Sequence, residues 1–234
     1  MPRSPGYVYF CEVKSIRNRK LSIIKKPKLK QLIKKFIPES IQVLIFNYLN
    51  SRDYRKWISG GKPFPPPNIV KQKMVVEFAN SHGTHALVET GTYLGNMIFA
   101  QKKNFKEIYS IELAEIFYKL GVKRFKNHKH ISIVLGNSAE RLPEIINRAH
   151  GKILFWLDGH YSGGDTADSA CPVMDELEAI MNDRRSHVIL IDDARCFGES
   201  DYPSIEEITS YVRDHSQEFD LSIQDDVIRI VYQK

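Results

Sequence analysis

The sequence predicts an α/β fold: a doubly wound, mostly parallel sheet of seven strands that ends in an antiparallel strand pair. Two observations predict it. From residue 85 onward, short and nearly continuous apolar runs alternate with helical patterns, as expected when helices cover both faces of a parallel sheet. The last two runs, FDLSIQ and VIRIVYQ, are separated only by Asp225 and Asp226, so no crossover helix fits between them and one must run antiparallel.

Five strand–helix units precede this closing pair. Strands are predicted at 85–90, 107–113, 131–138, 152–160 and 187–194, and the closing strands at 219–224 and 227–233. Helices are predicted at 94–102, 114–126, 139–149, 171–181 and 204–215. Right-handed crossovers between such units bring the carboxyl ends of the parallel strands to one edge of the sheet, where open α/β sheets bind ligands.

A basic leader lies in front of the sheet. Residues 1–38 contain eleven Lys or Arg and one acid, Glu12, so this segment carries +10 and the remaining chain 6 − 10 = −4. Its lysines alternate with apolar residues at helical spacing, and Pro38 is expected to divide the helix, with Ser40 as a candidate cap for the second piece. Glycines and prolines at 60–68 indicate a linker. We therefore expect two parts: a basic helical leader with a Pro-rich linker at 1–68, and an α/β domain at 69–234.

The composition narrows the class of protein. Hydrophobic residues make up 42% and charged residues 26% of the chain, as in ordinary globular proteins. No apolar run is long enough to span a membrane, and no signal peptide is recognisable at the N-terminus. The three cysteines lack CxxC spacing, which argues against a disulfide framework or a structural zinc site and favours a reducing, cytoplasmic setting. Because the excess positive charge belongs to the leader, we do not interpret the whole chain as a nucleic-acid-binding protein.

Every predicted parallel strand ends in polar residues directly after its apolar run. They are Glu89, Glu112, Asn137, Ser138, Asp158, His160, Asp192 and Asp193. Turn chemistry alone accounts for some of them, because Asp and Asn favour loops. Their concentration at one edge of the sheet predicts a binding site there.

The first of these strand ends has the pattern of a cofactor-binding turn. In LVETGTYLGN, Gly91 and Gly95 allow the backbone to come close to a ligand and offer backbone N–H groups at the following helix. Glu112 lies about one βαβ step later, where an acid can accept both ribose hydroxyls. NAD is a competing cofactor, but its fingerprint is GxGxxG, and this chain has only GxxxG. A plain tight turn is the alternative to a cofactor cradle.

The order of these motifs, ETGTYLG, SIEL, GNS, LDGH and IDDA followed by an antiparallel pair, resembles the class I S-adenosylmethionine (SAM)-dependent methyltransferases, which have a Rossmann-like sheet. The resemblance covers roughly residues 85–234 and implies that SAM is the cofactor. It implies a loop that binds the methionine part of SAM, an acidic side chain that binds the ribose, and polar side chains that contact adenine and other parts of the cofactor. On this chain the corresponding residues are Glu89, Gly91, Thr92, Gly95, Glu112, Asn137, Ser138 and Asp158.

Three further carboxylates at the sheet edge require a second explanation. Asp158, Asp192 and Asp193 follow strands that we expect to be neighbours, and clustered carboxylates repel one another unless a cation or a proton is present. A divalent ion with oxygen ligands, such as Mg²⁺, is the simplest solution. The arrangement also resembles the metal-dependent O-methyltransferases of the catechol and macrocin types. In such an enzyme the ion would lower the pKa of a substrate hydroxyl, and His160 is a candidate general base beside Asp158.

We therefore expect a SAM-dependent methyltransferase that methylates a hydroxyl of a small molecule or glycan with the help of a metal ion. An NAD-linked oxidoreductase or another enzyme on a similar scaffold, and a non-catalytic binding module, are the alternatives. The leader suits a helix that docks on the domain or forms a homodimer, or one that lies peripherally on an anionic membrane surface. Nucleic acid is disfavoured, because the leader shows no ordered pattern of stacking aromatics.

Overall fold

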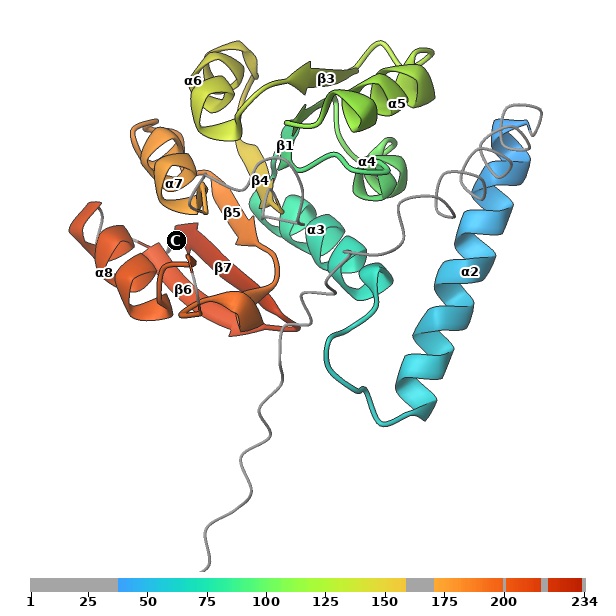
Figure 1. Cartoon of the computed structure of the whole chain (residues 1–234), viewed down its shortest axis with the longest axis horizontal. Helices are drawn as coiled ribbons and strands as arrows, with labels where there is room; N and C mark the ends of the chain where they lie inside the picture. The colour runs from blue at the N-terminus through green and yellow to red at the C-terminus, as the bar shows by residue number, and fades with distance from the viewer. Residues whose placement is uncertain (1–37, 159–170, 200, 216–218, 233–234) are drawn as a thin grey trace, which may run out of the picture. The chain divides into compact units, whose positions relative to one another are not determined.

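The computed structural model describes residues 38–158, 171–199, 201–215 and 219–232 (Figure 1). The chain divides into two compact units, 1–55 and 56–234, and helix α2 (Glu39–Ser59) crosses that boundary. The carbonyl of Pro38 accepts hydrogen bonds from the N–H groups of Ile41 and Gln42, so the helix begins directly after the proline, as predicted. Ser40 lies in the first turn and does not cap it. Among the described residues, no helix is both long enough and apolar enough to cross a membrane.

The second unit contains the seven-stranded sheet that the sequence predicts. Its strand order is β3-β2-β1-β4-β5-β7-β6. The first five strands pair in parallel, whereas β7 runs antiparallel to both β5 and β6. The strands are β1 (Ala86–Thr90), β2 (Glu107–Glu112), β3 (Ile131–Leu135), β4 (Ile153–Leu157), β5 (Val188–Ile191), β6 (Phe219–Gln224) and β7 (Val227–Tyr232).

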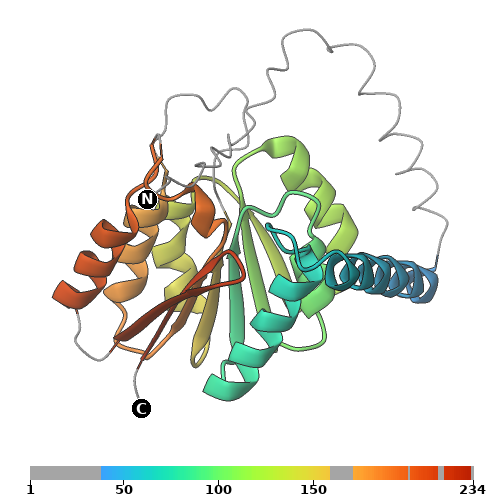
Figure 2. The same ribbon diagram turned by 90° about the horizontal axis from the view of Figure 1, so that it is seen from below.

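Helices cover both faces of this sheet, which makes it doubly wound. Figure 2 shows α6, α7 and α8 on one side and α3 and α5 on the other. The helices are α3 (Asn68–His82), α4 (Asn96–Gln101), α5 (Glu115–Phe125), α6 (Ser138–Arg148), α7 (Val173–Met181) and α8 (Ile205–His215), with a short 3₁₀ turn η1 (Ala194–Cys196) after β5. The central strands β1, β4 and β5 are buried along their whole length, which explains their continuous apolar sequences.

Helix α3 is the element that the sequence pattern does not single out. It packs against α4, β4 and β5, and its buried residues are Lys71, Gln72, Met74, Val75 and Ala79. Two polar residues therefore occupy positions on the buried face of the helix, and they interrupt the apolar period that normally reveals an amphipathic helix. This interruption has a consequence for the site, because Lys71 points toward the carboxyl ends of β4 and β5.

Candidate active site

A pocket opens at the carboxyl ends of the two neighbouring central strands β1 and β4. The loop after β1 forms one wall, with Gly91, Thr92, Tyr93 and Leu94. The other described lining residues are Asn68, Lys71, Gln72, Glu89, Asn96, Met97, Trp156, Asp158 and Asp192. The structure thus brings the predicted glycine turn and two of the predicted aspartates to one pocket.

The glycine turn is held by hydrogen bonds within the protein. Gly91 and Gly95 have φ of 86° and 66°, values that favour glycine over residues with a Cβ. The N–H groups of Gly91 and Thr92 donate to the carbonyl of Ile111 at 2.9 and 3.3 Å, and that of Gly95 donates to the carbonyl of Thr92 at 2.6 Å. The amides of Gly91 and Gly95 therefore shape the loop, and the contact of this turn with a ligand stays a prediction.

Glu112, the predicted ribose ligand, ties two loops together. One of its carboxylate oxygens accepts the N–H of Tyr93 at 2.7 Å, and the other accepts the N–H of Ala114 at 2.8 Å. The side chain is buried, and it joins the turn after β1 to the start of α5. A carboxylate has about four lone-pair sites, so each oxygen keeps capacity for a further donor such as a hydroxyl. Glu112 does not line the described pocket wall, and its contact with a ribose stays a prediction.

Glu89 is a buried acid at the inner end of the pocket. Its side chain accepts a short hydrogen bond from the Ser110 hydroxyl, which lies 2.6 Å from the Thr92 hydroxyl. Since Ser110 donates its proton to Glu89, Thr92 must donate to Ser110. Burial raises the pKa of Glu89 well above its usual range, and the Ser110 hydrogen bond only partly offsets this effect. A positively charged ligand group beside Glu89 would stabilise its ionised form.

Asn137 and Ser138, the predicted adenine ligands, also have structural roles. The side-chain oxygen of Asn137 accepts the N–H of Ala139 at 2.9 Å and caps α6. Ser138 is hydrogen-bonded to Glu176 of α7, which is almost completely buried. Burial raises the pKa of Glu176 to about 7, although hydrogen bonds from Ser138 and Thr90 oppose the shift. Contacts of Asn137 and Ser138 with an adenine base stay predictions.

Asp158 and Asp192 follow adjacent strands, as predicted. The N–H of Asp158 donates to the carbonyl of Thr90 at 3.1 Å, and the N–H of Asp192 donates to that of Leu157 at 2.9 Å. These bonds extend the parallel pairing to the two aspartates. Burial raises the pKa of Asp158 well above its usual range, and the negative charges of Asp192 and Asp193 raise it further. His160, the candidate base, lies outside the described residues.

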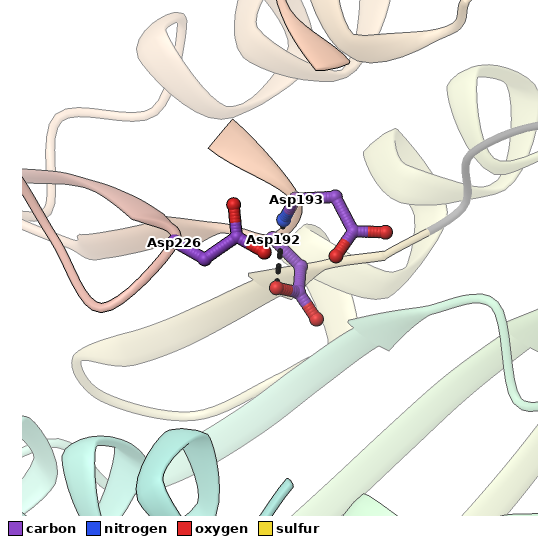
Figure 3. Close-up of side chains that lie close together, drawn as sticks. All are labelled: Asp192, Asp193 and Asp226. Carbon is purple, nitrogen blue, oxygen red and sulfur yellow. Dashed lines mark hydrogen bonds between the residues drawn. The ribbon is translucent and has the colours of Figure 1, made fainter. Parts of the chain in front are cut away.

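The tightest group of acids differs from the predicted set in one member. Side-chain oxygens of Asp192, Asp193 and Asp226 all lie within 4.8 Å of one another (Figure 3). Asp226 comes from the turn between β6 and β7, where it and Asp225 adopt the positive φ values, 66° and 52°, of a tight hairpin turn. Asp158 is not part of this acidic trio.

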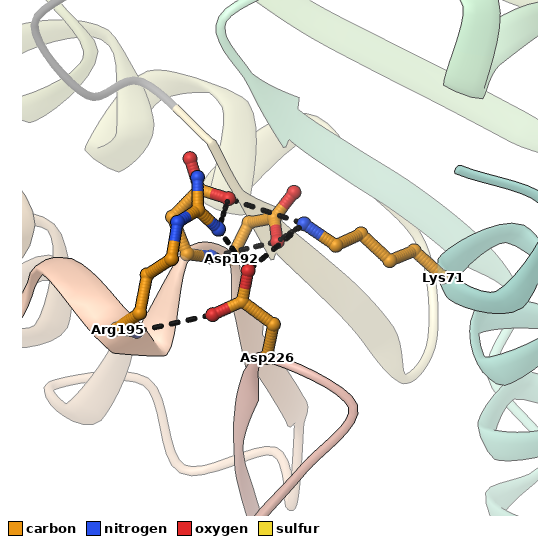
Figure 4. Close-up of polar contacts among 5 residues, drawn as sticks. Lys71, Asp192, Arg195 and Asp226 are labelled. Carbon is orange, nitrogen blue, oxygen red and sulfur yellow. Dashed lines mark hydrogen bonds and ion pairs between the residues drawn. The ribbon is translucent and has the colours of Figure 1, made fainter. Parts of the chain in front are cut away.

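A lysine ammonium group occupies the cation position in the trio. The Nζ of Lys71 forms an ion pair with Asp192, lies 3.1 Å from Asp193 Oδ1 and 3.7 Å from Asp226 Oδ2 (Figure 4). On the other side, Arg195 pairs with Asp226 and with Asp193, the latter at 2.8 Å. Burial alone would lower the pKa of Lys71, but the charges of Asp192 and Asp193 outweigh burial and raise it.

The same geometry tests whether a divalent ion fits the trio. Mg²⁺ and Ca²⁺ bind carboxylate oxygens at about 2.0–2.6 Å and need most of their coordination sphere filled by oxygen. Here a positively charged, buried nitrogen contacts the oxygens that would be the ligands. An ion does not fit beside Lys71 as these residues are arranged, and we derive no step through a metal.

The sequence alone did not reveal Lys71 or Asp226 as members of the site. Lys71 lies in an unassigned stretch before the first predicted strand, and the sequence indicates Asp226 only as a turn residue. The sequence holds two signals: a lysine beside the apolar residues of a helical segment, and a doubled aspartate in a two-residue turn. Neither signal points to this site from the sequence alone, because Asp226 reaches the other aspartates only through the pairing of β7 with β5.

The comparisons with known proteins agree on the fold. No protein-family model and no curated protein matches the sequence. An O-methyltransferase from Bacillus cereus in complex with SAH matches with a TM-score of 0.53 and 13% identity, over 88% of this chain and 97% of that chain. The SAH-bound methyltransferase PaMTH1 from Podospora anserina matches with a TM-score of 0.54 and 12% identity, over 92% and 98%. The O-methyltransferase TomG from Streptomyces achromogenes, in complex with SAM, matches with a TM-score of 0.50 and 12% identity, over 79% and 89%.

These likenesses show that the chain has the fold of the SAM-dependent O-methyltransferases. The sheet, the C-terminal antiparallel pair and the pocket edge are those that the sequence resemblance implies. At identities of 12–13% the likeness concerns the fold, and the activity of this chain has to be argued from its own residues.

Proposed function

We propose that this protein is a SAM-dependent methyltransferase that methylates a hydroxyl oxygen of a small molecule or glycan. The observation that carries the proposal is the pocket in which the glycine turn, buried Glu89 and the aspartates after β4 and β5 meet. That pocket lies at the carboxyl edge of the sheet, in a fold shared with SAH- and SAM-bound O-methyltransferases.

The charge of the pocket favours a cationic cofactor. Glu89, Asp158 and Asp192 line it against one cation, Lys71, among the described residues. SAM supplies a methyl group on a positively charged sulfur and also carries an amino group. Acids at the inner wall would attract both charges, whereas the phosphates of NAD would be repelled. Glu112 keeps acceptor capacity for the ribose hydroxyls beside the same loop.

Asp158 is the candidate base for the proton that the acceptor releases. When a hydroxyl oxygen forms a bond to the methyl carbon, the bond from that carbon to sulfur breaks with its electrons left on sulfur, and the hydroxyl proton must go to a base. Asp158 lines the pocket, and its raised pKa brings it closer to the range in which a general base works near neutral pH. His160 remains a second candidate from the sequence.

The divalent ion that the sequence predicts is not part of this mechanism, because Lys71 holds the cation position. The identity of the acceptor as a small molecule or glycan, a cytoplasmic location with peripheral membrane contact, and a homodimer formed through the leader are further proposals from the sequence. They are independent of the cofactor pocket.

Calorimetry with SAM and NAD⁺ tests the proposed function. We expect the full chain to bind SAM and SAH and to give no heat with NAD⁺. Asp158→Asn should keep SAM binding, because the proposed role of Asp158 is proton transfer. Glu115→Ala, at an exposed position of α5, is the control. Binding of NAD⁺ without SAM would overturn the proposal.

A further inference from the structure

We propose that Lys71 is a tethered cation that replaces a divalent metal ion in this protein, and that its ammonium group binds the acceptor oxygen. Its placement stands on the geometry of the acidic trio, and its part in methyl transfer rests on the proposed function.

Both the backbone and the ammonium group of Lys71 are held in place by contacts. Its backbone belongs to α3, which packs against β4 and β5, and its side chain is 7% exposed. Its Nζ lies between the aspartates that follow β5 and the aspartate of the β6–β7 turn (Figure 4). The N–H of Asp193 also donates to Asp192 Oδ1 at 2.7 Å, so the carboxylate that receives Lys71 is itself held in place.

The charge count favours one tethered cation over a free ion. Three carboxylates, Asp192, Asp193 and Asp226, meet two cations, Lys71 and Arg195. A divalent ion added to this group would lie within a few ångströms of the ammonium and be repelled by it. For the ion to enter, Lys71 would have to leave its buried ion pairs. Because Lys71 is covalently attached to the chain, its ammonium group is present at the carboxylates at a high effective concentration. A free ion would have to displace it, which disfavours ion binding.

With respect to the described residues, the ammonium group of Lys71 keeps one N–H donor for a ligand. It carries three N–H bonds, of which hydrogen bonds to Asp192 and Asp193 use two. The 3.7 Å separation from Asp226 Oδ2 is longer than a hydrogen bond. Lys71 lines the pocket together with Asp158 and Asp192. Its third N–H can therefore reach an acceptor oxygen and stabilise the negative charge that develops as Asp158 takes the proton.

Ion binding to the full chain tests the inference, with Mn²⁺ as the probe. After chelation and buffer exchange, Mn²⁺ affinity is measured by water-proton relaxation, and the melting temperature is recorded with and without Mn²⁺. The samples are wild type, Lys71→Met, Asp226→Asn, and the double variant Lys71→Met/Asp226→Asn. Lys73→Met, an exposed lysine on the same helix, is the matched control.

We expect wild type and Lys73→Met to show no Mn²⁺-dependent rise in melting temperature. Lys71→Met removes the ammonium group from the acidic trio. This variant should therefore bind Mn²⁺ roughly tenfold or more tightly than wild type, and its melting temperature should rise with Mn²⁺. The double variant should lose that gain. SAM-dependent methylation by wild type should be insensitive to chelators.

Mn²⁺ binding to wild type that Asp226→Asn abolishes would overturn the inference, and this result needs no folded Lys71 variant. Equal affinities of wild type and Lys71→Met would also overturn it. Should Lys71→Met not fold, Lys71→Gln keeps a polar side chain and removes the charge. SAM calorimetry on the same samples separates the two claims: without SAM binding the proposed function fails, whereas the ion result still decides what occupies the trio.

Discussion

Glu112 illustrates how one side chain can serve both the fold and a ligand. Its position at the end of β2 makes it a candidate ribose ligand, and that role depends only on strand order. The structure adds that its two oxygens hold the N–H groups of Tyr93 and Ala114. No sequence pattern indicates this second role, because the partners come from two separate loops.

Replacement of Glu112 by Ala should therefore affect both binding and stability. Two backbone N–H groups lose their acceptor, which we expect to lower the free energy of unfolding by about 1–3 kcal/mol. SAM affinity should fall roughly tenfold or more, because the wall of the pocket loses its anchor. Urea unfolding and calorimetry measure the two effects. A variant with wild-type affinity for SAM would show that Glu112 is only structural.

Glu176 gives a pH-dependent contribution to stability. Its pKa is about 7 in the folded protein against an ordinary value of 4.5, so the folded state binds the proton more tightly than the unfolded state. The stabilisation is present below about pH 4.5 and is lost as the pH rises to about 7, by up to about 1.4 kcal/mol per pH unit.

The variant Glu176→Gln should lack this loss, since it cannot ionise. We expect wild type and Glu176→Gln to differ little at pH 5 and the variant to be the more stable at pH 8, as measured by urea unfolding. Glu178→Gln, an exposed position on the same helix, should follow the wild-type pH profile. Identical pH dependences of wild type and Glu176→Gln would show that Glu176 ionises normally.

At the scale of single elements, the loop between β1 and α4 depends on Gly95. This residue has φ of 66°, and a Cβ there would lie 2.7 Å from Cε2 of Phe125 in α5. Gly83, after α3, has a similar φ of 61°, but no described atom lies within 4 Å of its Cβ position. A Cβ at Gly83 would therefore cost backbone strain alone, whereas a Cβ at Gly95 would cost backbone strain and a clash.

Alanine at each position should resolve these two costs. Gly83→Ala should lower the free energy of unfolding by about 1–2 kcal/mol through backbone strain alone. Gly95→Ala should cost a further 1–3 kcal/mol, roughly, from the clash with Phe125, and should weaken SAM binding because Leu94 and Asn96 line the pocket. Equal losses in both variants would contradict the packing argument.

The strands and most helices follow from the sequence, because their burial matches a simple period. The continuous apolar runs of β1, β4 and β5 are buried throughout, and α6 has its apolar residues on one face. Helix α3 does not follow, since Lys71 and Gln72 are polar residues on its buried face, and Lys71 is buried because of its ion pairs, which periodicity does not detect. The acidic trio was predicted only in part, because Asp226 joins it through the pairing of β7 with β5.

At the scale of the whole chain, charge is divided between the leader and the rest. Residues 1–38 carry +10 and the remainder −4. Each lysine near an anionic surface contributes about 1 kcal/mol, and this attraction falls off within a Debye length, which shortens as salt is added. We therefore expect the full chain to pellet with anionic vesicles at low salt and less at high salt. Replacing Lys25, Lys26, Lys28 and Lys30 by Gln should weaken this association without changing SAM affinity. Pelleting that is indifferent to anionic lipid would remove the membrane alternative for the leader.

A crystal structure of the full chain with SAH and Mn²⁺ soaked together tests the central claim most directly. The account predicts the nucleoside beside the turn at Gly91, with its ribose toward Glu112, and Lys71 still paired with Asp192 and Asp193. SAH bound elsewhere, or a manganese ion among Asp192, Asp193 and Asp226 with Lys71 displaced, would contradict it.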